Sequence, residues 1–337
     1  QAITSETRFE VTTLTKGLKS PWGLAFLPDG RSIVTERAGQ IRIVSKQGEI
    51  GDAIKGVPAV FFEGQGGLLD IALSPNFAKD RYIYWSFAEK RDKGAGSSVA
   101  RGRLSEDETA FTDVEVIFRQ QPAWDSAYHF GSRLIFSPSG HLFITLGDRG
   151  SKEVRKLAQD SNTTIGKTVR IWPDGSIPDD NPFVKGKAPA VWTMGHRNIQ
   201  GGAMHPVSGE LWTIEHGPAG GDELNRLVPG KNYGWPVITY GEDYSGQPIG
   251  DDITQKPGLE QPLYYFDPVI APGDMIFYTG ELFPDWQHNI FIAAMKEQAV
   301  VRLKMDKLRV AGEERLVQGE GRIRDIAQDP AGRISWV

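Results

Sequence analysis

The stretch 129–150 reads HFGSRLIFSPSGHLFITLGDRG and decides the fold class. It holds two short apolar runs, rich in aromatic and β-branched residues, on either side of a Ser-Pro-Ser-Gly turn. This pattern predicts a β-hairpin with His129 at its entry and Asp148 just past its exit. Both side chains should therefore emerge at one end of the hairpin, where the carboxylate could orient the histidine as a base.

Similar hairpins recur along the chain. With the one at Gly131 there are six, and the others begin at Trp22, Leu68, Gly201, Gly273 and Arg324. Their turn prolines are Pro28, Pro75, Pro138, Pro206, Pro284 and Pro330. A four-stranded propeller blade takes about 40 to 50 residues, so the wider spacings in the middle of the chain imply insertions that can build a site on one face.

The repeats predict an all-β protein: one domain over residues 1–337, a six-bladed β-propeller of four-stranded antiparallel blades with long insertions on the active-site face. The alternative is a β-sandwich or two β domains, but a sandwich would not repeat one hairpin signature six times. The chain ends at Val337, inside an expected strand, so the last blade should be truncated and lack its closing strand.

Composition limits the function classes. The formal net charge is -5 and there is no basic block, which argues against nucleic-acid binding. No apolar run is long enough to cross a bilayer. The chain has no cysteine, so disulfide and thiolate chemistry are excluded. No apolar edge stands out, which favours a monomer.

Five polar residues occupy equivalent places in their repeats, at the edge of the innermost strand: Gln65, His129, Arg197, Lys296 and Arg324. Each alone has an ordinary explanation, such as a tight loop for Gln65 or a hydrogen-bonded structural histidine for His129. Their coincidence in five of six repeats favours a shared functional site.

Two further segments carry candidate ligands. In the loop 215–223, Gly217 and Pro218 offer carbonyls and Asp222 and Glu223 offer carboxylates, which are the oxygen ligands calcium prefers, although a solvated acidic loop is equally compatible. In GRIRD, Arg322 and Arg324 alternate and should project from one strand face, where they suit a carboxylate ligand or a pair of interblade salt bridges.

The motifs GQGG, HFGSRL, GDRG, GHRN, HGPAGGDE, the lysine after FIAAM, and GRIRD occur in this order along the chain. The ordered set resembles the soluble pyrroloquinoline quinone (PQQ) dependent glucose/sorbosone dehydrogenases, most closely the bacterial soluble aldose sugar dehydrogenases. The resemblance runs over essentially the whole length. It implies a PQQ- and calcium-dependent enzyme that oxidises aldose sugars at the anomeric carbon to the lactone and passes electrons to an unidentified acceptor.

The resemblance also implies residue roles. His129 matches the general base, Asp148 the carboxylate that orients it, and Arg197 a group near the reacting quinone oxygen. The implied cofactor contacts are Gln65, Arg197, Asn198, Lys296, Arg322 and Arg324, with Tyr244 as a residue that could cap the ring or simply lie at the surface. Gly217 and Pro218, through their carbonyls, match ligands of the calcium bound to PQQ. Glu223, and Tyr233 through its carbonyl, match a second calcium.

Two departures concern the sugar. Tyr128 stands where the glucose dehydrogenase branch has an aspartate, and His216 where it has a glutamine, so we expect a broad aldose range. The resemblance further implies a periplasmic or otherwise exported protein, including one peripheral to the outer membrane, and a start at Gln1-Ala2 is compatible with signal cleavage. The competing hypotheses are a calcium-dependent lactonase or esterase whose axial carboxylates hold the metal, and a propeller that only binds a partner.

Overall fold

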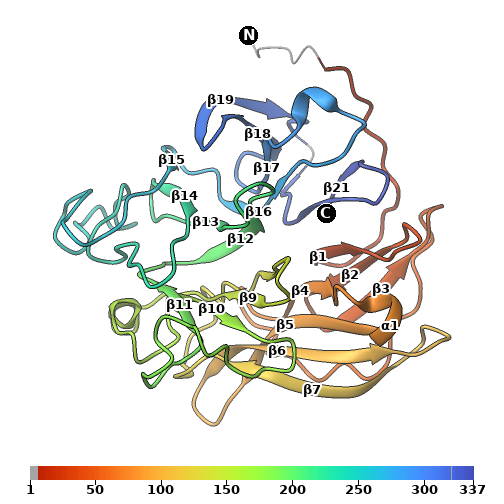
Figure 1. Ribbon diagram of the computed structural model, residues 1–337, viewed down its shortest axis with the longest axis horizontal. Coiled ribbons are helices and arrows are strands. Elements are labelled where there is room, and N and C mark those ends of the chain that lie inside the picture. The colour runs from red at the N-terminus through yellow and green to blue at the C-terminus, as the bar shows by residue number, and fades with distance from the viewer. Residues whose placement is uncertain (1–6, 320) are drawn as a thin grey trace.

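The computed structural model describes residues 7–319 and 321–337, so Gln1 and Ala2 lie outside the described residues. Antiparallel β-sheets follow one another around the molecule in chain order (Figure 1). Helices are few and short: α1 (Phe77–Asp80) and the two 3-10 turns η1 (Arg155–Gln159) and η2 (Pro284–Trp286). The predicted all-β propeller is therefore confirmed.

The first half of the chain forms three sheets. The first contains β1 (Pro21–Phe26), β2 (Ser32–Glu36) and β3 (Gln40–Val44). The second contains β4 (Leu68–Leu73), β5 (Tyr82–Lys90), β6 (Ala95–Leu104) and β7 (Phe111–Arg119). The third contains β8 (Leu134–Phe136), β9 (Leu142–Thr145), β10 (Lys167–Ile171) and β11 (Val191–Met194).

The second half adds two four-stranded sheets and one strand pair. The fourth sheet contains β12 (Ile199–Met204), β13 (Leu211–Glu215), β14 (Asp222–Arg226) and β15 (Tyr264–Phe266). The fifth contains β16 (Pro272–Phe277), β17 (Ile290–Ala294), β18 (Ala299–Asp306) and β19 (Arg309–Leu316). The last is the pair β20 (Ile326–Gln328) and β21 (Ile334–Trp336).

The prediction of six four-stranded blades is wrong. The described residues form five blades, of which the first has three strands, and a separate two-stranded sheet, β20–β21. The hairpin beginning at Arg324 carries the same turn signature as the others, but no further strand pairs with it in the described chain. β20 contacts β16 on one side and β1 on the other, so the pair completes the ring that the five blades begin.

Strand burial follows position in the ring. Every residue of β2, β9, β13 and β17 is buried, because these strands lie between neighbouring blades and pack on both faces. Outer strands such as β7 show exposed and half-buried residues instead. The predicted hairpins were recognisable because their runs are apolar on both faces.

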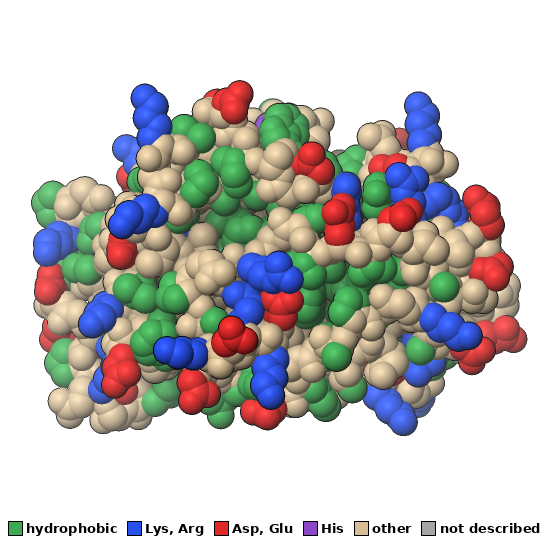
Figure 2. All heavy atoms as spheres, turned by 90° about the horizontal axis from the view of Figure 1, so that it is seen from below, with side chains coloured by type: hydrophobic (Ala, Val, Ile, Leu, Met, Phe, Trp, Pro, Cys, Tyr) green, Lys and Arg blue, Asp and Glu red, His purple; other side chains and the backbone are tan. Residues whose placement is uncertain are grey.

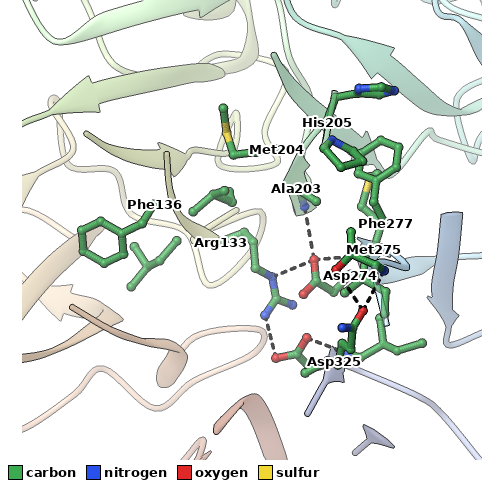
Figure 3. Close-up of a pocket in the computed structure, with 18 of the residues that line it drawn as sticks. Arg133, Phe136, Ala203, Met204, His205, Asp274, Met275, Phe277 and Asp325 are labelled. Atoms are coloured by element: carbon green, nitrogen blue, oxygen red, sulfur yellow. Dashed lines mark hydrogen bonds and ion pairs between the residues drawn. The ribbon is translucent and has the colours of Figure 1, made fainter. Parts of the chain in front are cut away.

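The axis of the ring is occupied by Arg133, which follows the His129 loop (Figure 3). Its guanidinium donates to Asp70 Oδ1 at 2.9 Å, to Asp325 Oδ2 at 3.0 Å and to the carbonyls of Gln200 and Gly273 at 2.6 and 2.7 Å. Asp274 Oδ1 lies 3.5 Å from its Nε. The Arg133 side chain thus joins its own sheet to four others. A cavity of about 780 Å³ lies beside it and is lined by Met204, His205 and Phe277, among others.

Positive and negative side chains are interspersed over the side of the molecule shown in Figure 2. None of the helices within residues 7–319 and 321–337 has the length and apolar character needed to cross a membrane.

Candidate active site

The predicted pairing of His129 with Asp148 is present. Nδ1 of His129 lies 2.7 Å from Asp148 Oδ1, which also accepts the Gly150 N–H at 2.8 Å. Burial opposes the charge on Asp148, but the hydrogen bond from His129 and the charges of His129 and Arg197 prevail and lower the pKa of this carboxyl. An ionised Asp148 can only accept, so Nδ1 of His129 is the donor in this hydrogen bond.

The backbone around His129 is held in an uncommon conformation. His129 has φ +54°, in the left-handed region that side chains other than glycine seldom adopt. Its carbonyl is so close to Gly147 that a Cβ there would lie 1.9 Å from the oxygen. Only glycine fits at this position, and the close approach places Asp148 directly beside the histidine.

Gln65 lies beside His129, as its place in the repeat predicts. Its Oε1 accepts the His129 N–H at 2.9 Å, and its own N–H donates to the Ala127 carbonyl at 2.8 Å. Arg37 holds this loop through hydrogen bonds to the Gly64 carbonyl and, at 2.9 Å, the Gly66 carbonyl. Sequence reasoning missed Arg37 because its partners are 27 and 29 residues away and no local pattern marks them.

Arg197 and Asn198 join the His129 loop to the glycine-rich loop after β13. The Arg197 carbonyl accepts the Asp148 N–H at 2.7 Å, and Asn198 Oδ1 accepts the Gly131 N–H at 3.1 Å. The Arg197 guanidinium donates to the Gly217 carbonyl at 2.8 Å. His129, Arg197 and Gly217 therefore lie at the same end of the ring.

His216 lies among these charges. Burial and the positive charges of Arg197 and Arg324 lower the pKa of His216 to about 3, so its ring is neutral at physiological pH. Nε2 lies 2.6 Å from the Pro272 carbonyl and must donate, because a carbonyl cannot. The replacement of glutamine by histidine at this position thus adds no charge to the site.

Asp222, one of the two candidate carboxylates of the loop 215–223, is engaged by backbone N–H groups. Its carboxylate accepts the Gly217 N–H at 2.6 Å and the Ile270 and Ala271 N–H groups at 2.8 and 2.9 Å. Burial nevertheless outweighs these bonds and raises the pKa of Asp222 to about 6. This side chain fixes the loop that carries the Gly217 and Pro218 carbonyls.

Glu223 lies in a group of oxygens with excess negative charge. Burial and the nearby Glu215 carboxylate raise the pKa of Glu223 well above its usual range. Asn225 Nδ2 lies 3.2 Å from Glu215 Oε1 and 3.3 Å from Glu223 Oε2, while its buried Oδ1 has no hydrogen-bond partner within the described chain. Tyr233 is placed nearby, since its ring stacks on His196, the partner of Glu215.

The three predicted cations differ in environment. Arg324 donates to Gln200 Oε1 at 3.0 Å, and burial together with the charges of Arg322 and Arg37 lowers its pKa to about 9. Arg322 and Lys296 are exposed, and in residues 7–319 and 321–337 neither forms an ion pair. Arg322 and Arg324 precede β20, so the prediction that they project from one face of a strand is wrong. Their positive charges are nevertheless close enough to interact.

Tyr244 is 78% exposed on the long loop between β14 and β15. No hydrogen bond or ring contact joins it to the other candidate residues among those the structure describes. The structure therefore does not bring Tyr244 into the group.

Residues 18–337 match the family model described as Glucose / Sorbosone dehydrogenase. The chain belongs to this family of oxidoreductases. It is 43% identical over 330 residues to the aldose sugar dehydrogenase YliI of Escherichia coli, with 96% of this chain and 88% of the relative covered. The predicted family resemblance is thus confirmed.

Solved structures that resemble this dehydrogenase include two aldose sugar dehydrogenases. The apo-form of the soluble aldose sugar dehydrogenase from Escherichia coli is 42% identical, with a TM-score of 0.92 over 96% of this chain and 94% of that one. The PQQ-bound aldose sugar dehydrogenase from Streptomyces coelicolor is 30% identical, with a TM-score of 0.79 over 96% and 88%.

Proposed function

We propose that this dehydrogenase oxidises aldose sugars at the anomeric carbon to the lactone, with PQQ and calcium as cofactors. The observation that carries the proposal is the His129–Asp148 pair, held at the same end of the ring as Arg197, the Gly217 carbonyl and a group of cations. A relative with this fold was solved with PQQ bound.

The cations fit an acidic quinone. Arg324 is half-buried next to the positive charges of Arg322 and Arg37, which is unfavourable unless an anion balances them. PQQ is a tricarboxylate, and guanidinium groups bind carboxylates bidentately. We therefore assign Arg322, Arg324 and Lys296 to its acidic groups, with Gln65 and Asn198 as the other contacts in the proposal.

The carbonyls and carboxylates fit calcium at two places. The Gly217 carbonyl already accepts from a cation, Arg197, and with Pro218 it would hold the calcium next to the quinone. Glu223, with the Tyr233 carbonyl, would hold the second calcium, and Asn225 Oδ1, which has no hydrogen-bond partner among the described residues, offers a further oxygen in this part of the molecule. When bound, PQQ would supply the hydride acceptor and calcium the Lewis acid that polarises it.

The protein supplies the base and its orientation. Nε2 of His129 accepts the proton of the anomeric hydroxyl, and Asp148 stabilises the imidazolium that forms. The guanidinium of Arg197 stabilises negative charge that develops during the reaction. We further propose that the chain is a single-domain monomer, is exported to the periplasm, and passes electrons to a separate acceptor.

The competing lactonase hypothesis requires axial carboxylates that hold a metal. Here the axial carboxylates Asp70, Asp274 and Asp325 surround the guanidinium of Arg133, which favours the dehydrogenase. Two assays separate the hypotheses: dye reduction driven by an aldose after reconstitution with PQQ and calcium, and lactone hydrolysis with calcium alone. We expect activity only in the first. Hydrolysis alone would support a lactonase, and inactivity in both would support a binding propeller.

A further inference from the structure

Trp235 contacts the carboxylate that orients the proposed base. Its indole Nε1–H donates to Asp148 Oδ2 at 2.7 Å, across 87 residues of sequence. Asp148 is 1% exposed, and its other oxygen is occupied by His129 and the Gly150 N–H. Trp235 is therefore the partner that completes the hydrogen bonding of this buried carboxylate.

The same indole ring also lies against Arg197. The Arg197 guanidinium carbon is 5.5 Å from the ring centroid, within the range of a cation–π contact. A second guanidinium, that of Arg155, lies 5.6 Å from the centroid. Asp148 and Arg197 reach the site from different blades, and the Trp235 side chain contacts both of them.

Trp235 is itself held firmly. Trp235 is 6% exposed. Its backbone N–H donates to the Gly195 carbonyl at 3.0 Å, and its backbone carbonyl accepts from Gln159 Nε2 at 2.6 Å. A ring fixed at both backbone ends has little freedom to follow a side chain that moves. It can therefore restrict the side chains that contact it.

We propose that Trp235 is a positioning residue, which holds Asp148 through its indole N–H and Arg197 through its ring, and so aligns the base with the arginine. The inference rests on the proposed function, because the reaction gives this alignment its purpose. It goes beyond that function because neither the sequence motifs nor the family resemblance singled out Trp235.

The two contacts predict separable effects. A hydrogen bond to a carboxylate favours its charged form, so loss of the N–H should make Asp148 easier to protonate. The groups that face Asp148 are His129, the Gly150 N–H, Trp235 and the charges of Arg197 and Arg149. Of these, Trp235→Phe would remove only the Trp235 donor. The phenyl ring would keep an aromatic face toward Arg197.

The experiment compares Trp235→Phe with Trp212→Phe as a matched control. Trp212 is fully buried, and its Nε1 has no hydrogen-bond partner in the described part of the chain. Both substitutions remove one indole N–H from the interior, but only one takes it from Asp148. Each variant is measured for kcat, KM, PQQ affinity by absorbance titration and the pH profile of kcat/KM.

We expect Trp235→Phe to lower kcat roughly tenfold, because a hydrogen bond to a charged group is lost. The acid limb of the pH profile should move up by about half a pH unit or more, while PQQ affinity changes less than about threefold. Trp212→Phe should leave the profile of the wild-type protein unchanged. Equal profiles for the two variants, or a shift in Trp212→Phe alone, would overturn the proposal.

A measurement without cofactor or sugar separates this proposal from the proposed function. The carbon-13 signal of the Asp148 carboxyl is titrated in the cofactor-free protein, and its midpoint should be higher in Trp235→Phe than in the wild type. An unchanged midpoint would refute the role of the N–H even if sugar oxidation is confirmed. If Trp235→Phe does not fold, the indole N–H proton signal of the wild type should move with the Asp148 titration, and a signal that does not move counts against the proposal.

Discussion

His129 combines a left-handed backbone with an Nδ1 that donates to Asp148. Each property has a visible cause: the Gln65 side chain accepts the backbone N–H, Asp148 accepts from the ring, and glycine at position 147 admits the carbonyl. The local hairpin was enough to predict the pairing of His129 with Asp148. The roles of Arg37 and Trp235 were not predictable, because their partners lie on other blades.

His129→Ala should lower kcat by about two to four orders of magnitude, the usual contribution of a positioned general base. PQQ affinity should stay within a few-fold of the wild type, since the proposed cofactor contacts are other side chains. His141→Ala is the control, because His141 lies at the turn of the same hairpin, away from Asp148. Turnover at the wild-type rate in His129→Ala would refute the assignment of the base.

At the scale of elements, the loop 216–222 is fastened by one carboxylate to the segment before β16. The sequence suggested Asp222 as a calcium ligand because its side chain type fits, but pattern alone cannot show which backbone N–H groups a carboxylate meets. The position of Arg322 and Arg324 was mispredicted for a similar reason. The strand after them begins at Ile326, two residues beyond Arg324, so neither arginine lies in it.

The pKa of Asp222 gives this loop a pH dependence. The carboxyl has an ordinary pKa of 3.8 and a folded-state pKa of about 6, so between these values the folded protein binds more protons than the unfolded one. Stability from this group is therefore present at pH 4 and is lost as the pH rises to 6. The stability advantage of the wild type over Asp222→Asn should fall by up to about 3 kcal/mol in this window.

Denaturant unfolding of both proteins at half-unit pH steps measures this difference. The comparison cancels the contributions of other titrating groups, which the two proteins share. A difference that is constant, or that grows as the pH rises from 4 to 6, would contradict the account of this loop.

At the scale of the whole molecule, the ring is joined at its axis by Arg133. The repeated hairpins predicted that inner strands would meet there, and the quoted stretch contains Arg133, but its partners come from four other sheets and only the closed ring brings them together. Repeat counting also predicted six four-stranded blades, the last of them truncated, where the described residues form five blades and a strand pair. The repeats reveal the number of hairpins but not the number of outer strands that pair with each hairpin. The prediction therefore gave the β20–β21 pair more strands than it has.

Arg133→Met should destabilise the protein by about 3 to 5 kcal/mol, because it leaves buried carboxylates without their counter-charge. Denaturant unfolding followed by circular dichroism measures the loss. Arg103→Met, which removes an exposed arginine paired with Asp113 at 3.5 Å, should be indistinguishable from the wild type. Equal stability of the two variants would show that Arg133 does not hold the axis.

The central claim is that residues from separate blades converge on a site that reduces bound PQQ with electrons from a sugar. The most direct test mixes the calcium-loaded PQQ holoprotein with an aldose in the absence of oxygen and follows the absorbance of the quinone. We predict rapid reduction in the wild type and slow reduction in His129→Ala, with PQQ bound in both. Bound PQQ that no aldose reduces, or equal rates in the two proteins, would contradict the account.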